Sequence, residues 1–188
     1  MGRGSSKAGG GANSMTAPKS EYDREVDSLA NALAAPYGAE QRERGEYPFS
    51  NSDLEAAVEA YAMTHKGVDE NKMLEAVRDR AEYYEAYNDE KRIQMGDVPI
   101  ANAFSSENRS DADVEAYMRN YASAIGDPIR AMESQKASLK RQYEPYKDAK
   151  SNTDLGTKQA MSEMLSEYDV AIARMKKIKK NSKRPDLL

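Results

Sequence analysis

The sequence predicts an all-α fold, a helical bundle of about six helices. Ala, Glu, Lys, Met and Arg, which favour helices, are abundant, whereas β-branched residues are scarce. Apolar residues recur every three or four positions along several segments, as on the buried face of an amphipathic helix. Gly and Pro stand between these segments, where helices end. No stretch is apolar for long enough to span a bilayer, so we expect no membrane insertion.

The N-terminal half contains residues that typically begin and end helices, and they predict three helices there. We expect one helix from Ser20 to the residues before Pro36, since a serine hydroxyl can accept from the first-turn backbone. A second begins at Ser52, where Glu55 completes a capping box, and ends at Gly67. The third runs from about residue 69 to Gly96.

Three more helices are expected in the C-terminal half. Ser110 caps the first of them, which closes at Gly126. Asp127 followed by Pro128 starts the next, and Pro145 bends or ends it. The last begins near Thr157 and carries the most regular apolar stripe in the chain: Met161, Met164, Leu165, Tyr168, Ile172, Met175 and Ile178.

Two segments of the chain resemble each other. Residues 52–95 and 110–149 both read as a pair of helices, and both contain Val-Glu-Ala-Tyr, at 58–61 and 114–117. Met73 and Met132 follow their turn glycines at the same distance. The pattern is consistent with a duplicated αα-hairpin, or with two similar amphipathic hairpins from an Ala-, Glu- and Tyr-rich composition.

Composition divides the chain into an arm, a body and a tail. Residues 1–19 are rich in Gly and Ser and cannot bury enough surface to offset their ordering entropy, so we expect a disordered arm. They also lack the apolar core of a signal peptide, so we expect no export. Residues 20–180 form the helical domain, and 181–188 form a flexible basic tail.

Charge is separated along the sequence. The net charge is −4, but residues 1–20 carry +3 and residues 174–188 carry +6. The body between them, 21–173, holds 31 acidic and 18 basic side chains, a net of −13. An acidic body with basic ends favours electrostatic association with charged partners.

The residues needed for common catalytic or metal sites are few. There is no Cys and only one His, His65, which precedes Gly67 and suits the C-terminal end of a helix dipole. No glycine-rich phosphate loop follows a strand. Glu82, Glu85 and Asp89 have helical spacing, but such rows are typical of a solvated face. We therefore expect no enzyme activity, no metal and no cofactor.

One candidate partner site is the segment DRAEYYEAYNDE, residues 79–90. Its three tyrosines do not fit one narrow stripe, so at least one ring should be exposed beside carboxylates. Exposed rings and carboxylates suit a basic groove on a partner protein, whereas an ordinary helix with a broad buried face is the alternative. The predicted partner-binding residues are Glu82, Tyr83, Glu85, Tyr87 and Asp89.

The second candidate is the basic C-terminal region. Clustered cations release counterions from a phosphate backbone, so RNA or DNA contact is one interpretation, and a solubilising helix end is the other. No aromatic residue interrupts the run, which argues against base stacking. The predicted nucleic-acid contacts are Lys176, Lys177, Lys179, Lys180, Lys183 and Arg184.

The opening MGRGSSKAGGG resembles the GRGSSK-GGG arms of small proteins encoded by phages and prophages. With a Cys-free, acidic, helical body, the chain resembles a phage anti-defence protein, the nearest kind being an anti-CRISPR inhibitor of type II Cas9. The resemblance implies a non-catalytic inhibitor in the cytoplasm of a bacterial host cell, which binds guide-loaded Cas9. An acidic body suits the positively charged channels of such nucleases.

Two other functions are consistent with the same features. A virion-associated or scaffolding protein could self-associate through long helices and touch a shell or packaged DNA with its basic tail. The stripe of the last helix, Met161 to Ile178, could pair with a second copy, but burial within its own bundle is the favoured interpretation. We also expect a homodimer. A small nucleic-acid-binding accessory protein fits less well, because the body is acidic and no recognition helix is evident.

Overall fold

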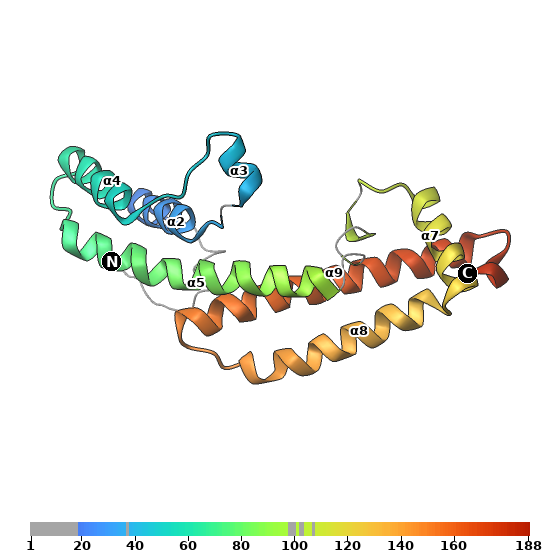
Figure 1. Ribbon diagram of the computed structural model, residues 1–188. Coiled ribbons are helices and arrows are strands. Elements are labelled where there is room, and N and C mark those ends of the chain that lie inside the picture. Colours follow the sequence, from blue (N-terminus) through green and yellow to red (C-terminus); the bar gives the residue numbers. More distant parts are fainter. Residues whose placement is uncertain (1–18, 37, 98–100, 102–103, 107) are drawn as a thin grey trace. The chain divides into compact units, whose positions relative to one another are not determined.

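Figure 1 shows the computed structural model, which describes residues 19–36, 38–97, 101, 104–106 and 108–188. All regular secondary structure among these residues is helical, so the predicted all-α class is confirmed. No helix among them combines the length and apolar character needed to cross a membrane. The predicted disordered arm lies outside the described residues, except for Lys19. The Lys19 ammonium pairs with the Asp27 carboxylate, so Lys19 belongs to the folded part.

The chain divides into two compact units. The first contains the residues up to 89 together with 149–159, and the second contains 90–148 and 160–188. The two longest helices, α5 (Glu70–Asp97) and α9 (Asn152–Asn181), contribute residues to both units. Helix α5 continues through the boundary after residue 89, and α9 through the boundary after residue 159. The sequence pattern is therefore unbroken at these points, and it predicts one helical domain over 20–180 where the structure has two units.

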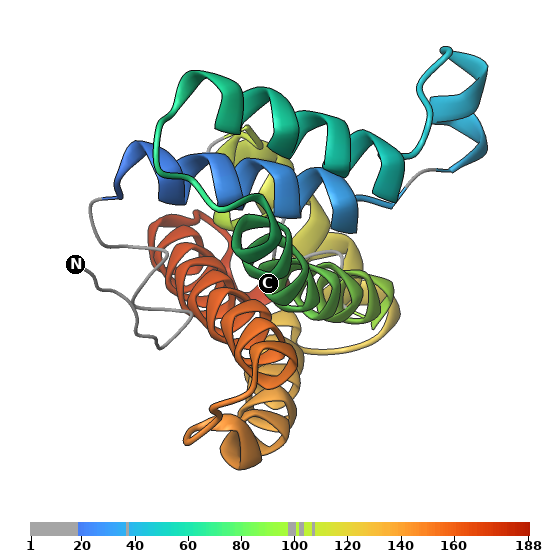
Figure 2. The same cartoon turned by 90° about the vertical axis from the view of Figure 1, so that its left-hand side faces the viewer.

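The first unit is built on α2 (Glu21–Ala34), α4 (Asn51–Thr64) and the first part of α5. Helices α2 and α4 lie side by side (Figure 2). A short helix, α3 (Ala39–Glu43), lies between α2 and α4. The buried apolar side chains of this unit come from all of its longer helices: Val26, Leu29, Leu54, Val58, Met73, Val77 and Leu155.

Local caps explain where the first two helices begin. The Ser20 hydroxyl accepts from the Asp23 amide at 3.1 Å, as predicted. Helix α4 begins two residues earlier than predicted, because Ser50 and Asp53 form the capping box in place of Ser52 and Glu55. The Ser50 amide donates to the Asp53 carboxylate at 2.8 Å, and the same contact holds the pKa of that carboxyl below its usual value.

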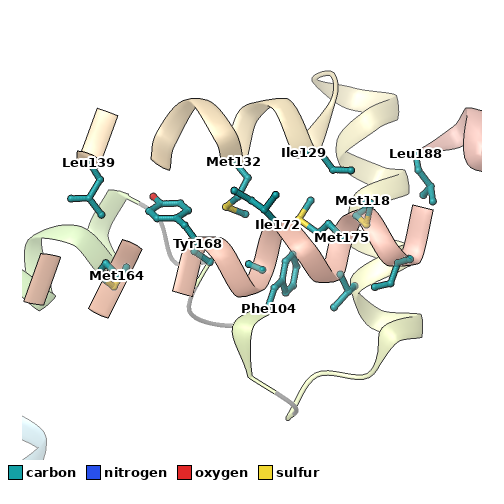
Figure 3. Packing of buried hydrophobic residues seen from close by; sticks show 14 of the residues in the cluster. Phe104, Met118, Ile129, Met132, Leu139, Met164, Tyr168, Ile172, Met175 and Leu188 are labelled. Carbon is teal, nitrogen blue, oxygen red and sulfur yellow. The ribbon is translucent and has the colours of Figure 1, made fainter. Parts of the chain in front are cut away.

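The second unit contains α7 (Asp111–Ala124), α8 (Pro128–Tyr143) and most of α9, with short 3₁₀ turns at η2 (Glu144–Tyr146) and η3 (Pro185–Leu187). Both predicted caps are present, at Ser110 and Asp127. Figure 3 shows how side chains from α7, α8 and α9 interdigitate in its core. The buried set includes Phe104, Met118, Ile129, Met132, Leu139, Met164, Tyr168, Ile172 and Met175.

Helix α9 begins at Asn152, five residues before the predicted start at Thr157. Ser151 caps it, its hydroxyl accepting from the Asp154 amide at 3.1 Å. Gly156 therefore lies inside α9 and not before it. The apolar stripe of α9 is buried in the core of its own unit, so it is not the exposed seam that pairing with a second copy would require.

The predicted flexible tail, 181–188, is instead folded back onto the second unit. Leu188 is only 5% exposed and belongs to the hydrophobic core there. The η3 turn that precedes it contacts α7. Composition alone predicted a flexible tail because basic residues precede the turn, and it did not show that Leu188 is buried.

Two pairs of consecutive helices, α4–α5 and α7–α8, lie where the sequence predicts similar hairpins. Their turns contain Gly67 and Gly126, each with a positive φ, at 86° and 157°. Met73 and Met132 are both buried in corresponding positions. The match is incomplete, since Val77 is buried where the second hairpin has the ion-paired Lys136. Duplication therefore stays a prediction.

Candidate interaction surfaces

Helix α5 presents a row of carboxylates, here called the acidic ridge. All of its members are exposed and lie in the first unit. Their spacing of three or four residues places them on one side of the helix, over about 21 Å at 1.5 Å per residue. The sequence predicted a partner site at Glu82, Glu85 and Asp89. It did not assign Glu75 and Asp79 to that site, although the same helical periodicity could have found them. The ridge consists of Glu75, Asp79, Glu82, Glu85 and Asp89.

The tyrosines predicted to accompany the ridge are not exposed. Tyr83 is fully buried, Tyr84 is 6% exposed, and Tyr87 is half-buried. The rings of Tyr83 and Tyr87 are parallel with centroids 6.4 Å apart, and Tyr84 meets Tyr83 edge-on at 5.3 Å. Burial raises the pKa of Tyr84. The prediction of Tyr83 as a partner contact is therefore wrong, because α5 buries a face wide enough for both adjacent tyrosines.

The buried tyrosines hold the ridge in place. The Arg80 guanidinium lies over the Tyr83 ring, 4.5 Å from its centroid, and 5.4 Å from that of Tyr84. The Arg80 Nε donates to the Asp27 carboxylate of α2 at 2.7 Å. These contacts fix the rotation of α5 about its axis and keep its carboxylates on the outer face.

Four of the predicted basic residues lie on different sides of α9, and Lys183 and Arg184 follow its end at Asn181. Lys176 pairs with Glu133 of α8, with a nitrogen–oxygen distance of 3.3 Å. Lys177 lines hollows toward α7, beside Asp111 and Glu115. Lys179 is half-buried, whereas Lys180 and Lys183 are exposed.

The remaining predicted contact, Arg184, precedes the η3 turn. Its guanidinium pairs with Asp186 at 3.3 Å, and this hydrogen bond holds the pKa of the Asp186 carboxyl below its usual value. The structure thus does not gather the predicted basic residues into one patch.

Arg174, in the same basic run, has a structural role. Its guanidinium donates to the carbonyl oxygens of Phe104 at 3.1 Å and Ser106 at 2.9 Å, and also to that of Arg109. Its Nε donates to Asp111 at 2.9 Å. Four bonds from one planar group fasten the segment before α7 to α9.

An open groove of about 480 Å³ lies between α8 and α9 and is here called the lysine groove. Lys136 and Lys140 line it from α8, and Lys176 lines it from α9. Glu133 and Asp169 also line it, and each pairs with a lysine across the groove. Sequence reasoning missed the α8 lysines, because they are far from the basic run in the chain.

The division into units also divides the charge. Residues 19–89 and 149–159 carry 18 acidic and 10 basic side chains, a net of −8. Residues 90–148 and 160–188 carry 14 acidic and 16 basic side chains, a net of +2. The acidic character of the chain is therefore concentrated in the first unit.

His65 occupies the helix end predicted for it. It is the C-cap residue of α4, and its ring stacks on Tyr61 with centroids 3.8 Å apart. Its Nδ1 lies 2.9 Å from the Tyr61 carbonyl oxygen, and its Nε2 lies 3.2 Å from the Glu21 carboxylate. The hydrogen bond to the Tyr61 carbonyl is the main cause of a raised His65 pKa.

No three His, Asp or Glu side chains in the described part of the chain are arranged to hold a metal ion. Comparison with protein families, with characterised proteins and with solved structures gives no match. The two surfaces are therefore interpreted from their own geometry.

Proposed function

We propose that the protein is a non-catalytic binding protein whose acidic ridge docks in a basic, nucleic-acid-holding groove of another protein. The observation that carries this proposal is the row of five exposed carboxylates on one side of α5. The opposite face of α5 packs in the core through Met73, Val77 and Tyr83, so the row is presented on a supported element.

The spacing of the ridge suits a groove that otherwise holds phosphates. Five carboxylates over about 21 Å place one negative charge every 5 Å or so. Phosphates in one strand of B-DNA follow each other at a rise of about 3.4 Å, so both present a dense line of negative charge. Electrostatic complementarity of this kind accelerates encounter and selects basic partners.

The partner to test first is guide-loaded Cas9. It follows from the resemblance of the N-terminal segment to the arms of phage-encoded anti-defence proteins. In this proposal the protein acts in the cytoplasm of a bacterial host cell, where it occupies a channel of the nuclease that would otherwise hold DNA.

The test is isothermal titration of guide-loaded Cas9 with the protein, together with a DNA-cleavage assay at the same salt concentrations. We expect binding that weakens between 50 and 300 mM salt, and inhibited cleavage. The variant Glu82→Lys/Glu85→Lys should weaken binding by tenfold or more. Circular dichroism should show unchanged helicity, since both side chains are exposed.

The matched control is Glu43→Lys/Glu59→Lys, which makes the same charge change at exposed positions of α3 and α4 in the same unit. It should bind nearly as the wild type does. Equal loss in both variants would show that total charge, not the ridge, governs binding. An absence of any complex would remove Cas9 as the partner, and large assemblies of the free protein in light scattering would favour the scaffolding alternative.

A further inference from the structure

We propose that the lysine groove between α8 and α9 binds the phosphodiester backbone of a nucleic acid. This inference does not depend on the acidic ridge or on its partner. The sequence predicted nucleic-acid contact along the basic C-terminal run, whereas this proposal places the contact on a face formed by α8 and α9 of the second unit.

The first observation is the convergence of cations from two separate helices. Lys136 and Lys140 are one turn apart on α8, and Lys176 and Lys180 are one turn apart on α9. The pairs Glu133–Lys176 and Lys136–Asp169 show that the helices run antiparallel here, since the α8 number rises as the α9 number falls.

The antiparallel register extends the row of cations in both directions. Lys180 lies one turn beyond Lys176, at the end where the exposed Arg130 precedes Glu133 on α8. Lys140 lies one turn beyond Lys136 at the other end. The groove lining itself holds three lysines and two carboxylates. Helical periodicity places Arg130 and Lys180 one turn beyond its ends, which makes five cations against two carboxylates over about 15 Å of α8. The five cations are Arg130, Lys136, Lys140, Lys176 and Lys180.

The second observation is the shape and chemistry of the groove. Its lining includes Ala137 and Ala173, whose small side chains leave room for a backbone to lie between the lysines. Lysine ammonium groups on flexible stems bind phosphates as point charges. Neither helix contributes an aromatic side chain to the lining, so bases have nothing there to stack on and binding should be independent of sequence.

The ion pairs within the groove fit this role. Lys176 is more than half exposed in its pair with Glu133, and Lys136 is about one-third exposed in its pair with Asp169. Exposed pairs contribute little to stability, so a phosphate can replace a carboxylate at small cost. The two carboxylates hold Lys136 and Lys176 across the groove.

The experiment measures fluorescence anisotropy of a labelled 20-nucleotide strand and a labelled 20-base-pair duplex of arbitrary sequence. Purified full-length protein is titrated at salt concentrations from 50 to 300 mM. We expect binding to at least one of the two at low salt, with an affinity that falls steeply as salt increases. The strand and the duplex share the same backbone chemistry, and the comparison shows which form the groove prefers.

The decisive variant is Lys140→Gln/Lys180→Gln, in which two exposed lysines lose their charge without breaking either cross-groove ion pair. Affinity should fall by about tenfold at 100 mM salt. The slope of log affinity against log salt should fall by about 1.4–1.8, since each phosphate contact contributes about 0.7–0.9.

The matched control is Lys66→Gln/Lys72→Gln, which removes two exposed charges from the first unit. It should leave affinity and slope nearly unchanged. Equal losses in both variants, or no binding by the wild type at 50 mM salt, would overturn the proposal. So would salt-sensitive self-association that only Lys140→Gln/Lys180→Gln abolishes, since the groove would then bind the acidic ridge of a second copy.

Discussion

At the scale of single residues, the structural roles of Gly156 and Arg174 could not be predicted from residue type. Gly156 lies within α9 where the helix backbone approaches α5, and a Cβ there would overlap the Tyr83 carbonyl oxygen and lie 3.0 Å from the Tyr87 amide nitrogen. Arg174 belongs to a basic run but binds backbone carbonyls. In both cases a neighbour distant in sequence decides the role, so residue type alone misassigns it.

We predict that Gly156→Ala destabilises the protein by about 3 kcal/mol, because a methyl group meets backbone that cannot move independently of α5. At 2–4 °C per kcal/mol for a chain of this size, the Tm should fall by about 6–12 °C. Differential scanning calorimetry measures the change. Ser166→Ala, at an exposed position of the same helix, should shift the Tm by little. A wild-type Tm in Gly156→Ala would contradict the close approach.

At the scale of helices, most boundaries follow from local chemistry. Ser20, Ser110 and Asp127 cap the helices predicted for them, since a side-chain oxygen three residues before an amide suffices. The beginnings of α4 and α9 differ from the prediction, because Ser50 and not Ser52 caps the first, and Ser151 caps the second five residues before its predicted start. The His65 ring joins the end of α4 to the start of α2 through Glu21.

The hydrogen bond of His65 to the Tyr61 carbonyl oxygen, with a smaller contribution from Glu21, predicts a pH-dependent contribution to stability. The His65 pKa is raised in the folded protein, so the bound proton favours folding. The contribution is full below the ordinary histidine pKa of about 6.5 and is lost as the pH rises through the raised value. The Tm difference between wild type and His65→Gln should be larger at pH 5.5 than at pH 8.5. Parallel Tm profiles across this range would exclude the effect.

At the scale of the whole molecule, the chain forms two compact units with separate hydrophobic cores. One carries a net charge of −8 in its described segments, and the other +2. The acidic ridge and the lysine groove fall in different units, so the proposed protein contact and nucleic-acid contact can be altered separately. The C-terminus completes the second core through Leu188.

We predict that Leu188→Ala weakens the second unit by about 2 kcal/mol, because a buried leucine is truncated. Hydrogen exchange read by mass spectrometry should show faster exchange in α7 and α8. Exchange in α2 and α4, in the first unit, should stay the same. Leu187→Ala, at the exposed neighbouring position, is the control. Uniform acceleration in both units would show that they unfold together.

Local sequence was enough to predict the all-α class, most helix ends and the exposed carboxylates Glu82, Glu85 and Asp89. These depend on periodicity and on caps that lie within a few residues of each other. Tertiary structure alone decided that Tyr83 is buried, that Leu188 anchors the C-terminus and that lysines of α8 and α9 share a groove. Each of these depends on which distant segments pack together, and the buried area of such contacts is not encoded in local spacing.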